Sequence, residues 1–366
     1  MIVQIWYENL RNVISDKLDE EGESLRRWKG YEHGVNLGGW LSQCDHTRER
    51  YDNFIIEDDI RRISTWGLDH IRVPIDYNLV EDEAGQYKER GFEYIERAAE
   101  WAGKHGLNMI LDLHKTYGFS FDPGHKEEGF FENEAYQERF YSLWEELARR
   151  FTDLGDRIAF ELLNEVTDKE YCETWNRIAA TCIARIRVIA PKTKILVGGY
   201  WNNSIAAVKD ILPPADENIV YNFHCYEPLI FTHQGAYWAP GMDPAFRISI
   251  HASYKELAAA SEKNLTQVTV SMEGVDENAS LGPEYFVHHF GEAVKVAEER
   301  DVPLYCGEYG VINLADPQES LEWYRIISEV FNRFGIGRAA WSYKEMDFGL
   351  IDGHMSDVFS ELIKEL

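Results

Sequence analysis

Apolar segments of strand length alternate with amphipathic segments of helix length along most of this chain. The apolar segments predict eight strands, at residues 34–37, 68–74, 107–114, 158–163, 194–199, 218–224, 302–308 and 336–342. The amphipathic segments predict the helices after them, at residues 54–66, 91–105, 134–151, 168–190, 203–212, 284–300 and 317–334, with a terminal helix from Ser356. Strands that are apolar throughout and alternate with helices indicate a parallel sheet covered on both faces.

Eight strand and helix repeats fit a closed (β/α)8 TIM barrel better than an open doubly wound sheet. No GxGxxG motif follows the first strand, which argues against a dinucleotide-dependent oxidoreductase. The alternation stops between residues 225 and 283, so we expect an inserted lid or subdomain after strand six, beside the active face; this insertion contains a further apolar run at 267–273. Residues 1–30 are polar and charged and predict an arm or lead-in helix, leaving residues 31–366 as the barrel.

Composition and charge narrow the classes of ligand. The chain has 37 Lys and Arg against 64 Asp and Glu, a net charge of −27, so its surface repels phosphate backbones and anionic membranes. We therefore expect neither a nucleic acid nor a membrane as partner. The 11 Trp and 20 Tyr could supply flat platforms for sugar rings.

The five cysteines show no zinc-type spacing, which favours free thiols in a reducing compartment. The first residues lack the pattern of a signal peptide, so we expect either a cytoplasmic protein or a secreted enzyme whose signal has been trimmed.

Polar side chains stand where the predicted strands end. Asn164 and Glu165 directly follow the apolar strand 158–163. The corresponding residues at the other strand ends are Asn36, Arg72, His114, Trp201, His224, Tyr226, Glu308 and Trp341. Each could serve a structural purpose alone, as an ion-pair partner, a core histidine or a core tryptophan. In a barrel, however, the carboxyl ends of all strands lie on one rim, so these side chains converge on one pocket.

Two glutamates in such a pocket, without a metal-ligand cluster, fit glycoside hydrolysis. One must hold a proton for the leaving oxygen while the other is ionised. Arg72 and Tyr226 would favour the ionised form of Glu308, and Asn164 could bind the sugar 2-hydroxyl group. Trp341 and Trp201 would be stacking floors for sugar rings. No cofactor and no metal is expected.

At these residues the chain resembles glycoside hydrolase family 5, from about Gly34 to Leu350. The motifs that carry the resemblance are IRVP, LDLH, LLNE, FHCY, CGEYG and AAWSY. Longer strings such as VNLGGWLSQ and YNFHCYEPLIFTHQGAYW are similar to the endoglucanase C branch. The resemblance implies a barrel that cleaves β-1,4-glucan or mixed-linkage β-glucan with retention, with Glu165 as general acid/base and Glu308 as nucleophile. The chain departs from the pattern at Lys115, where a second histidine is expected.

Several alternatives remain open from sequence. The main expectation is a monomeric endo-β-1,4-glucanase acting on soluble β-glucan or cello-oligosaccharides; an exo-acting β-glucosidase, a β-mannanase or a β-1,3-glucanase would use the same scaffold. A further alternative is not an enzyme but a protein that binds sugars without hydrolysing them. His233 and Trp238, in the insertion, are candidate subsite contacts, whereas Glu273 and Glu345 are expected to be surface or subsite carboxylates.

Overall fold

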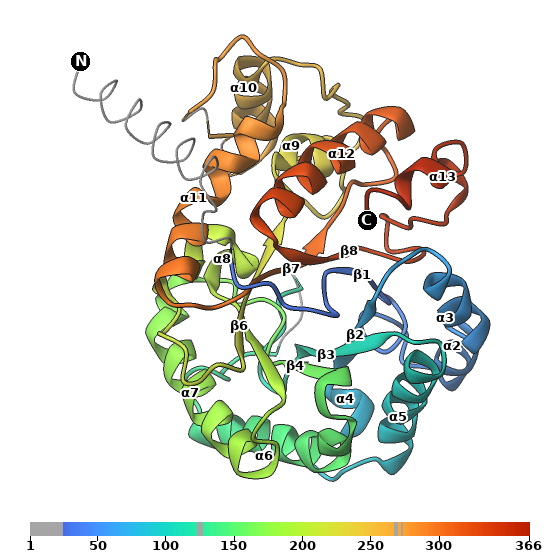
Figure 1. Cartoon of the computed structure of the whole chain (residues 1–366), viewed down its shortest axis with the longest axis vertical. Helices are drawn as coiled ribbons and strands as arrows, with labels where there is room; N and C mark the ends of the chain where they lie inside the picture. Colours follow the sequence, from blue (N-terminus) through green and yellow to red (C-terminus); the bar gives the residue numbers. More distant parts are fainter. Residues whose placement is uncertain (1–24, 123–126, 267–269, 272–273) are drawn as a thin grey trace.

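A computed structural model describes residues 25–122, 127–266, 270–271 and 274–366, and its centre is a closed barrel of eight parallel strands. Every strand pairs with its sequence neighbours, and β1 pairs with β8 to close the ring (Figure 1). The strands are β1 (His33–Asn36), β2 (His70–Asp76), β3 (Asn108–Lys115), β4 (Ile158–Glu161), β5 (Lys194–Val197), β6 (Ile219–Cys225), β7 (Leu304–Tyr309) and β8 (Gly337–Ala340). The predicted (β/α)8 barrel is confirmed.

Helices surround the barrel, as Figure 1 shows. The α-helices are α2 (Arg48–Asn53), α3 (Glu57–Ser64), α4 (Tyr77–Val80), α5 (Glu89–Lys104), α6 (Glu134–Phe151), α7 (Cys172–Ile189), α8 (Tyr200–Asn203), α9 (Leu229–Thr232), α10 (Tyr254–Asn264), α11 (Pro283–Glu299), α12 (Pro317–Phe334) and α13 (Phe359–Leu362). Short 3-10 helices occur at η1 (Thr152–Arg157), η2 (Lys169–Tyr171), η3 (Ile205–Asp210) and η4 (Gly353–Met355). Local sequence sets the boundaries of α12: the Asp316 side chain accepts hydrogen bonds from two backbone N–H groups of the first turn, and Gly335 ends the helix in the left-handed conformation.

Three predicted helices differ clearly from the structure. The segment predicted as helix at 203–212 forms only the 3-10 helix η3, because Pro213 and Pro214 follow and cannot continue a helix. The terminal helix predicted from Ser356 is reduced to η4 and the four-residue α13. In addition, the helix predicted at 54–66 begins at Glu57.

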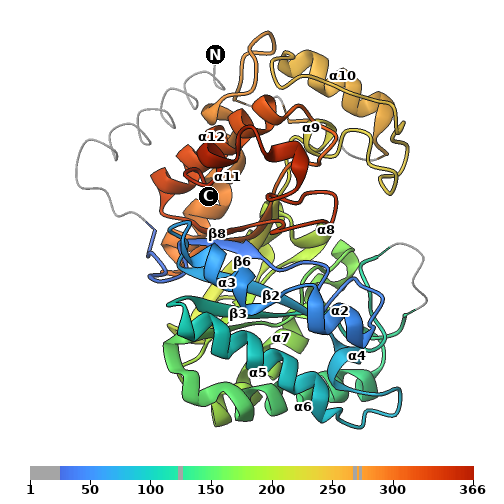
Figure 2. The ribbon, with the colours of Figure 1, turned by 90° about the vertical axis from the view of Figure 1, so that its right-hand side faces the viewer.

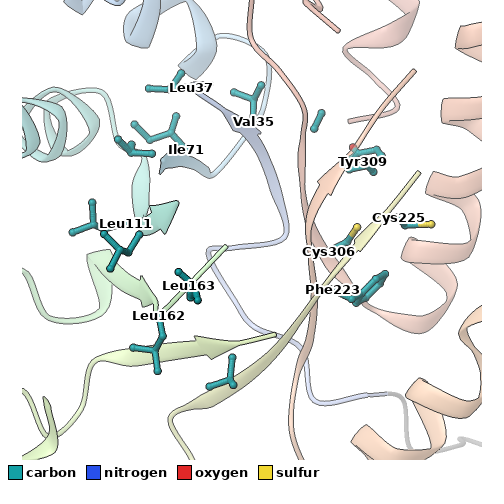
Figure 3. Close-up of a cluster of buried hydrophobic side chains, with 14 of the residues drawn as sticks. Val35, Leu37, Ile71, Leu111, Leu162, Leu163, Phe223, Cys225, Cys306 and Tyr309 are labelled. Atoms are coloured by element: carbon teal, nitrogen blue, oxygen red, sulfur yellow. The ribbon is translucent and has the colours of Figure 1, made fainter. Parts of the chain in front are cut away.

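The barrel interior is layered. An apolar layer at the amino-terminal end of the strands packs against Trp28 and Tyr31, which stack on each other; its strand members are Ile110, Ala159, Leu196, Val220, Tyr305 and Ala339. Further along the strands the interior becomes polar, with Arg72, Asp112 and Glu161 fully buried. Apolar side chains such as Phe223 and Leu111 belong to the larger core cluster that includes residues of the surrounding helices (Figure 3). The polar side chains are therefore enclosed by apolar side chains of the barrel and its helices.

The residues between β6 and α11, where we predicted an insertion, interrupt the alternation of strands and helices. They include α9 and α10, and α10 lies at the periphery of the molecule in both views (Figures 1 and 2). The carboxylate of Glu319, in the first turn of α12, accepts bonds from Ser249 Oγ at 2.8 Å and from the Ile250 N–H at 2.7 Å, which ties the insertion to the barrel. Most of the predicted run 267–273 lies outside the described residues.

Of residues 1–30, the predicted arm, only residues 25–30 belong to the described part of the chain, and Leu25 and Trp28 are buried. Among the described helices none combines the length and the apolar character needed to cross a membrane.

Candidate active site

Arg72, on β2, is the centre of the buried polar layer. Its guanidinium binds Glu161 through two bonds of 2.7 Å, and it lies 3.0 Å from Asp112 Oδ2. Nη1 also donates to Glu308 Oε1 at 2.8 Å, and Nη2 donates to Asn164 Oδ1 at 2.7 Å. Burial opposes the charge, but Asp112 and Glu161 outweigh it and hold the pKa of Arg72 well above its usual range. One permanent cation thus orders three carboxylates from three different strands.

Glu308, at the end of β7, is held by two donors. Arg72 binds Oε1, and the Tyr226 hydroxyl donates to Oε2 at 2.8 Å. Burial and the neighbouring Glu308 raise the pKa of Tyr226 far above its usual range, so Tyr226 keeps its proton and remains a donor. Each oxygen of the Glu308 carboxylate thus accepts a hydrogen bond, one from a cation and one from a hydroxyl group.

Glu165, just past β4, has a different environment. His224 Nδ1 lies 2.8 Å from Oε1, and Asn202 Nδ2 donates to Oε2 at 2.9 Å. Burial raises the pKa of Glu165 from 4.5 to about 7, so the carboxyl holds a proton over the acidic range and near neutrality. Burial also lowers the pKa of His224 to about 4, which keeps the imidazole neutral there.

The two glutamates face each other across a short gap. A carboxylate oxygen of Glu165 and one of Glu308 lie within 4.8 Å of each other, with His224 between them. Carboxyl groups about 5 Å apart leave room for a sugar carbon and not for an additional water molecule, which is the spacing of retaining glycosidases. The two environments differ, because burial favours the protonated form of Glu165 whereas Glu308 accepts bonds from a cation and a hydroxyl group.

Two groups among the described residues place three potential metal ligands within 4.8 Å of one another: Glu165 with His224 and Glu308, and Cys225 with Glu227 and His289. In the first group, the contacts of His224, Arg72 and Tyr226 with the carboxylates already explain the arrangement. The second group lies beside β6, where His289 is 3.8 Å from the Glu227 carboxylate.

Aromatic rings pack around the ends of the strands. Trp341, past β8, lies parallel to the His114 ring with centroids 5.7 Å apart. His233 contacts the Tyr226 ring edge-on at 5.1 Å, and Trp238 lies 6.2 Å from His233. The structure therefore brings the predicted insertion residues next to the strand-end residues.

The remaining predicted residues have distinct positions. Asn36 is fully buried; its amide donates to backbone carbonyls of β7 and β8, and its Oδ1 accepts from Arg72. It supports the arginine from within the barrel. Trp201 is 53% exposed, in the turn that also carries Asn202. Glu345 pairs with Arg50 at 3.1 Å on the surface, and Glu273 lies outside the described residues.

The sequence reasoning missed five polar residues of this network. They are Gln43, Asp112, Glu161, Asn202 and Asn222. Asp112 and Asn222 stand two residues before His114 and His224, so strand periodicity places each of them on the same inward face as the histidine. That spacing was a usable signal.

Lys115 marks the predicted departure from the family pattern. Its ammonium pairs with Asp122, whose other carboxylate oxygen accepts a bond from Gln43 Nε2 at 3.3 Å. Gln43 Oε1 in turn lies 3.2 Å from His114 Nε2. The lysine therefore takes part in a chain of contacts that ends at a strand-end histidine.

Comparison with known proteins identifies the family. Residues 18–347 match cellulase (glycosyl hydrolase family 5). The chain belongs to glycoside hydrolase family 5. Cellodextrinase A of Ruminococcus flavefaciens is 47% identical over 310 residues, which cover 85% of this chain and 84% of that protein. Endoglucanase C of Acetivibrio thermocellus is 36% identical over 339 residues, which cover 92% of this chain and 98% of that protein. The predicted resemblance to the endoglucanase C branch is confirmed, and this family 5 chain is a glycoside hydrolase.

The fold agrees with solved structures of the family. An endoglucanase from the hyperthermophilic Thermotoga maritima superposes with a TM-score of 0.72 at 22% identity, covering 92% of this family 5 chain and 97% of that one.

Proposed function

We propose that this chain is a retaining endo-β-1,4-glucanase that hydrolyses soluble β-glucan and cello-oligosaccharides, with Glu165 as general acid/base and Glu308 as nucleophile. The observation that carries the proposal is the pair of carboxyl groups within 4.8 Å of each other, one with its pKa raised to about 7 and the other bound by Arg72 and Tyr226. The names of the two relatives, a cellodextrinase and an endoglucanase, support cello-oligosaccharides as the substrate class.

The first chemical step breaks the glycosidic bond. Glu165 gives its proton to the leaving oxygen while Glu308 attacks the anomeric carbon, so that a covalent glycosyl ester forms and the shortened chain departs as an alcohol. Asn164, whose Oδ1 is already bound to Arg72, has its amide Nδ2 available to donate to an oxygen of the sugar. Such a bond strengthens as positive charge develops at the sugar ring.

The second step releases the sugar. Glu165, now a carboxylate, removes a proton from a water molecule, and the resulting oxygen attacks the anomeric carbon and displaces Glu308. Two inversions at one carbon give net retention. We further propose that the enzyme acts as a monomer, because all these side chains come from one chain.

Product analysis tests the reaction. Cellotetraose should be cleaved to β-configured shorter sugars, followed by NMR before mutarotation, and Glu308→Gln should reduce turnover by at least about 1,000-fold. Glu329→Gln, the same change at an exposed position of α12, is the control and should retain turnover. Initial products of α configuration, or hydrolysis of mannan without hydrolysis of β-glucan, would overturn the proposal.

The nucleophile can be identified directly. Incubation with a 2-deoxy-2-fluoro cellobioside bearing a dinitrophenyl leaving group should trap a covalent sugar ester, and peptide mass spectrometry should locate it on Glu308. A label on any other residue would contradict the assignment.

A further inference from the structure

The turn after β5 has an unusual backbone. Trp201, Asn202 and Asn203 have φ values of 53°, 54° and 59°, so three consecutive residues other than glycine are left-handed. Asparagine tolerates this conformation, but for tryptophan it costs roughly 1 kcal/mol or more. Strain of this kind persists only where the surroundings impose it.

The surroundings of the turn connect it to the catalytic acid. The N–H groups of Trp201 and Asn202 donate to the carbonyls of Thr167 and Val166, which directly follow Glu165, at 3.1 and 3.0 Å. On the other side, Ser204 forms a parallel bridge to His224. The turn is therefore joined to both segments that surround the Glu165 carboxyl.

Packing beneath the turn holds the same conformation. The buried Asn203 side chain accepts a bond from the Gly199 N–H at 3.1 Å, and a Cβ atom at Gly198 would lie 2.1 Å from Asn203 Oδ1. Only glycine at 198 permits this close approach. The left-handed turn then directs the Asn202 amide to Glu165 Oε2, at 2.9 Å.

We propose that Asn202 is a positioning residue for the general acid, holding Glu165 Oε2 while His224 holds Oε1. The inference rests on the proposed function, in which Glu165 donates the proton. Contacts to both oxygens define the plane of the carboxyl. As the proton leaves, negative charge develops on Glu165, and the amide bond to Oε2 strengthens because its acceptor becomes an anion. Asn202 thus favours the transition state over the ground state.

Charge around Glu165 supports this role. The charged and titratable groups that face it from the neighbouring elements are Arg72, Asp112, His114, Asp122, His224, Tyr226 and Glu308. Burial raises the pKa of Glu165, whereas the Asn202 amide lowers it. Removing the amide should therefore raise this pKa further and make the acid weaker.

The test uses Asn202→Gly and Asn202→Asp in the full chain. Glycine keeps the left-handed backbone without strain and removes the amide, while aspartate keeps the shape and the turn preference but cannot donate. With cellotetraose, whose leaving group needs the proton, kcat/KM should fall about 10-fold or more in both variants. With 2,4-dinitrophenyl β-cellobioside, whose leaving group departs without a proton, kcat/KM should stay within about twofold.

The pH profile gives a second readout. The alkaline limb of kcat/KM for cellotetraose should move up by about half a pH unit in Asn202→Gly, and further in Asn202→Asp, where a second negative charge faces Glu165. Asn278→Gly, at an exposed loop position, is the matched control. It should change neither kcat/KM for the two substrates nor the alkaline limb of the pH profile.

Two results would overturn the inference. The first is an unchanged kcat/KM for cellotetraose in both variants. The second is an equal loss of kcat/KM for cellotetraose and for 2,4-dinitrophenyl β-cellobioside, with no movement of the alkaline limb of the pH profile, because this combination indicates a purely structural role. The proposed function fails in a different way: a wild-type protein that does not cleave cellotetraose, or full turnover by Glu165→Ala, removes the acid assignment and this inference with it.

Discussion

Replacing Arg72 should destabilise the protein and inactivate it together. Arg72→Met keeps a side chain of similar length but removes the cation that lies within 3.0 Å of Asp112, Glu161 and Glu308. Removing one partner of a buried ion pair costs about 3–5 kcal/mol, because the remaining charge is left in an apolar frame. This is a large share of the roughly 5–15 kcal/mol that stabilises a typical protein.

The assay is thermal unfolding at neutral pH. For a chain of 366 residues, a loss of about 3–5 kcal/mol corresponds to a fall in Tm of roughly 4–7 °C. The matched control is Arg185→Met, because Arg185 also binds a carboxylate, that of Glu138, through two bonds of 2.7 and 2.6 Å, yet at the surface. Screening by water limits that loss to less than about 1 kcal/mol.

A double variant separates charge from packing. Glu161→Gln removes one of the carboxylates left unpaired in Arg72→Met, so the double variant should be more stable than Arg72→Met alone. Equal Tm values for Arg72→Met and the wild type, or no recovery in the double variant, would refute the view that one buried cation neutralises this cluster.

Three further outcomes follow from the site. Because the pKa of Glu165 is about 7 and its protonated form is the acid, kcat/KM for cello-oligosaccharides should fall as pH rises through about 7, and a profile that stays flat to pH 9 would contradict the assignment. The same raised pKa means that the neutral Glu165 carboxyl stabilises the fold below pH 4.5 and that this stability is lost as pH rises through 7. In urea unfolding, the free energy of unfolding of Glu165→Gln should therefore equal that of the wild type at pH 4 and exceed it by up to about 3 kcal/mol at pH 8. A difference that stays constant with pH would exclude this linkage. Tyr226→Phe removes the 2.8 Å bond to Glu308 and should lower kcat by about 10- to 100-fold in steady-state assays, with an unchanged rate as the contrary result.

The barrel and its rim were accessible from sequence because both depend on local patterns. Apolar runs predicted all eight strands, and the polar residues at their ends, such as Glu165 and Glu308, converge wherever parallel strands close into a ring. In the polar layer beneath, Arg72 was predicted but Asp112 and Glu161 were missed, although they are single carboxylates inside apolar strands and burial makes such residues costly without a partner.

Other features depend on contacts that no local pattern carries. Asn202 reaches Glu165 only because three residues adopt a left-handed turn, and that turn depends on distant backbone carbonyls and on the close approach of Gly198. The helix expected at 203–212 was wrong for a related reason, since periodicity alone does not distinguish a short 3-10 segment before two prolines from an α-helix.

The insertion after β6 separates two properties of the enzyme. The proposed acid and nucleophile and their buried cation lie on barrel strands or directly after them. In contrast, His233 and Trp238 belong to the segment between β6 and α11, which is bound to α12 through Glu319. Exchanging that segment for one from a relative would replace the candidate subsite residues His233 and Trp238 and leave the proposed acid, nucleophile and buried cation in place. We therefore expect such an exchange to change the preference for chain length without loss of the bond-breaking step.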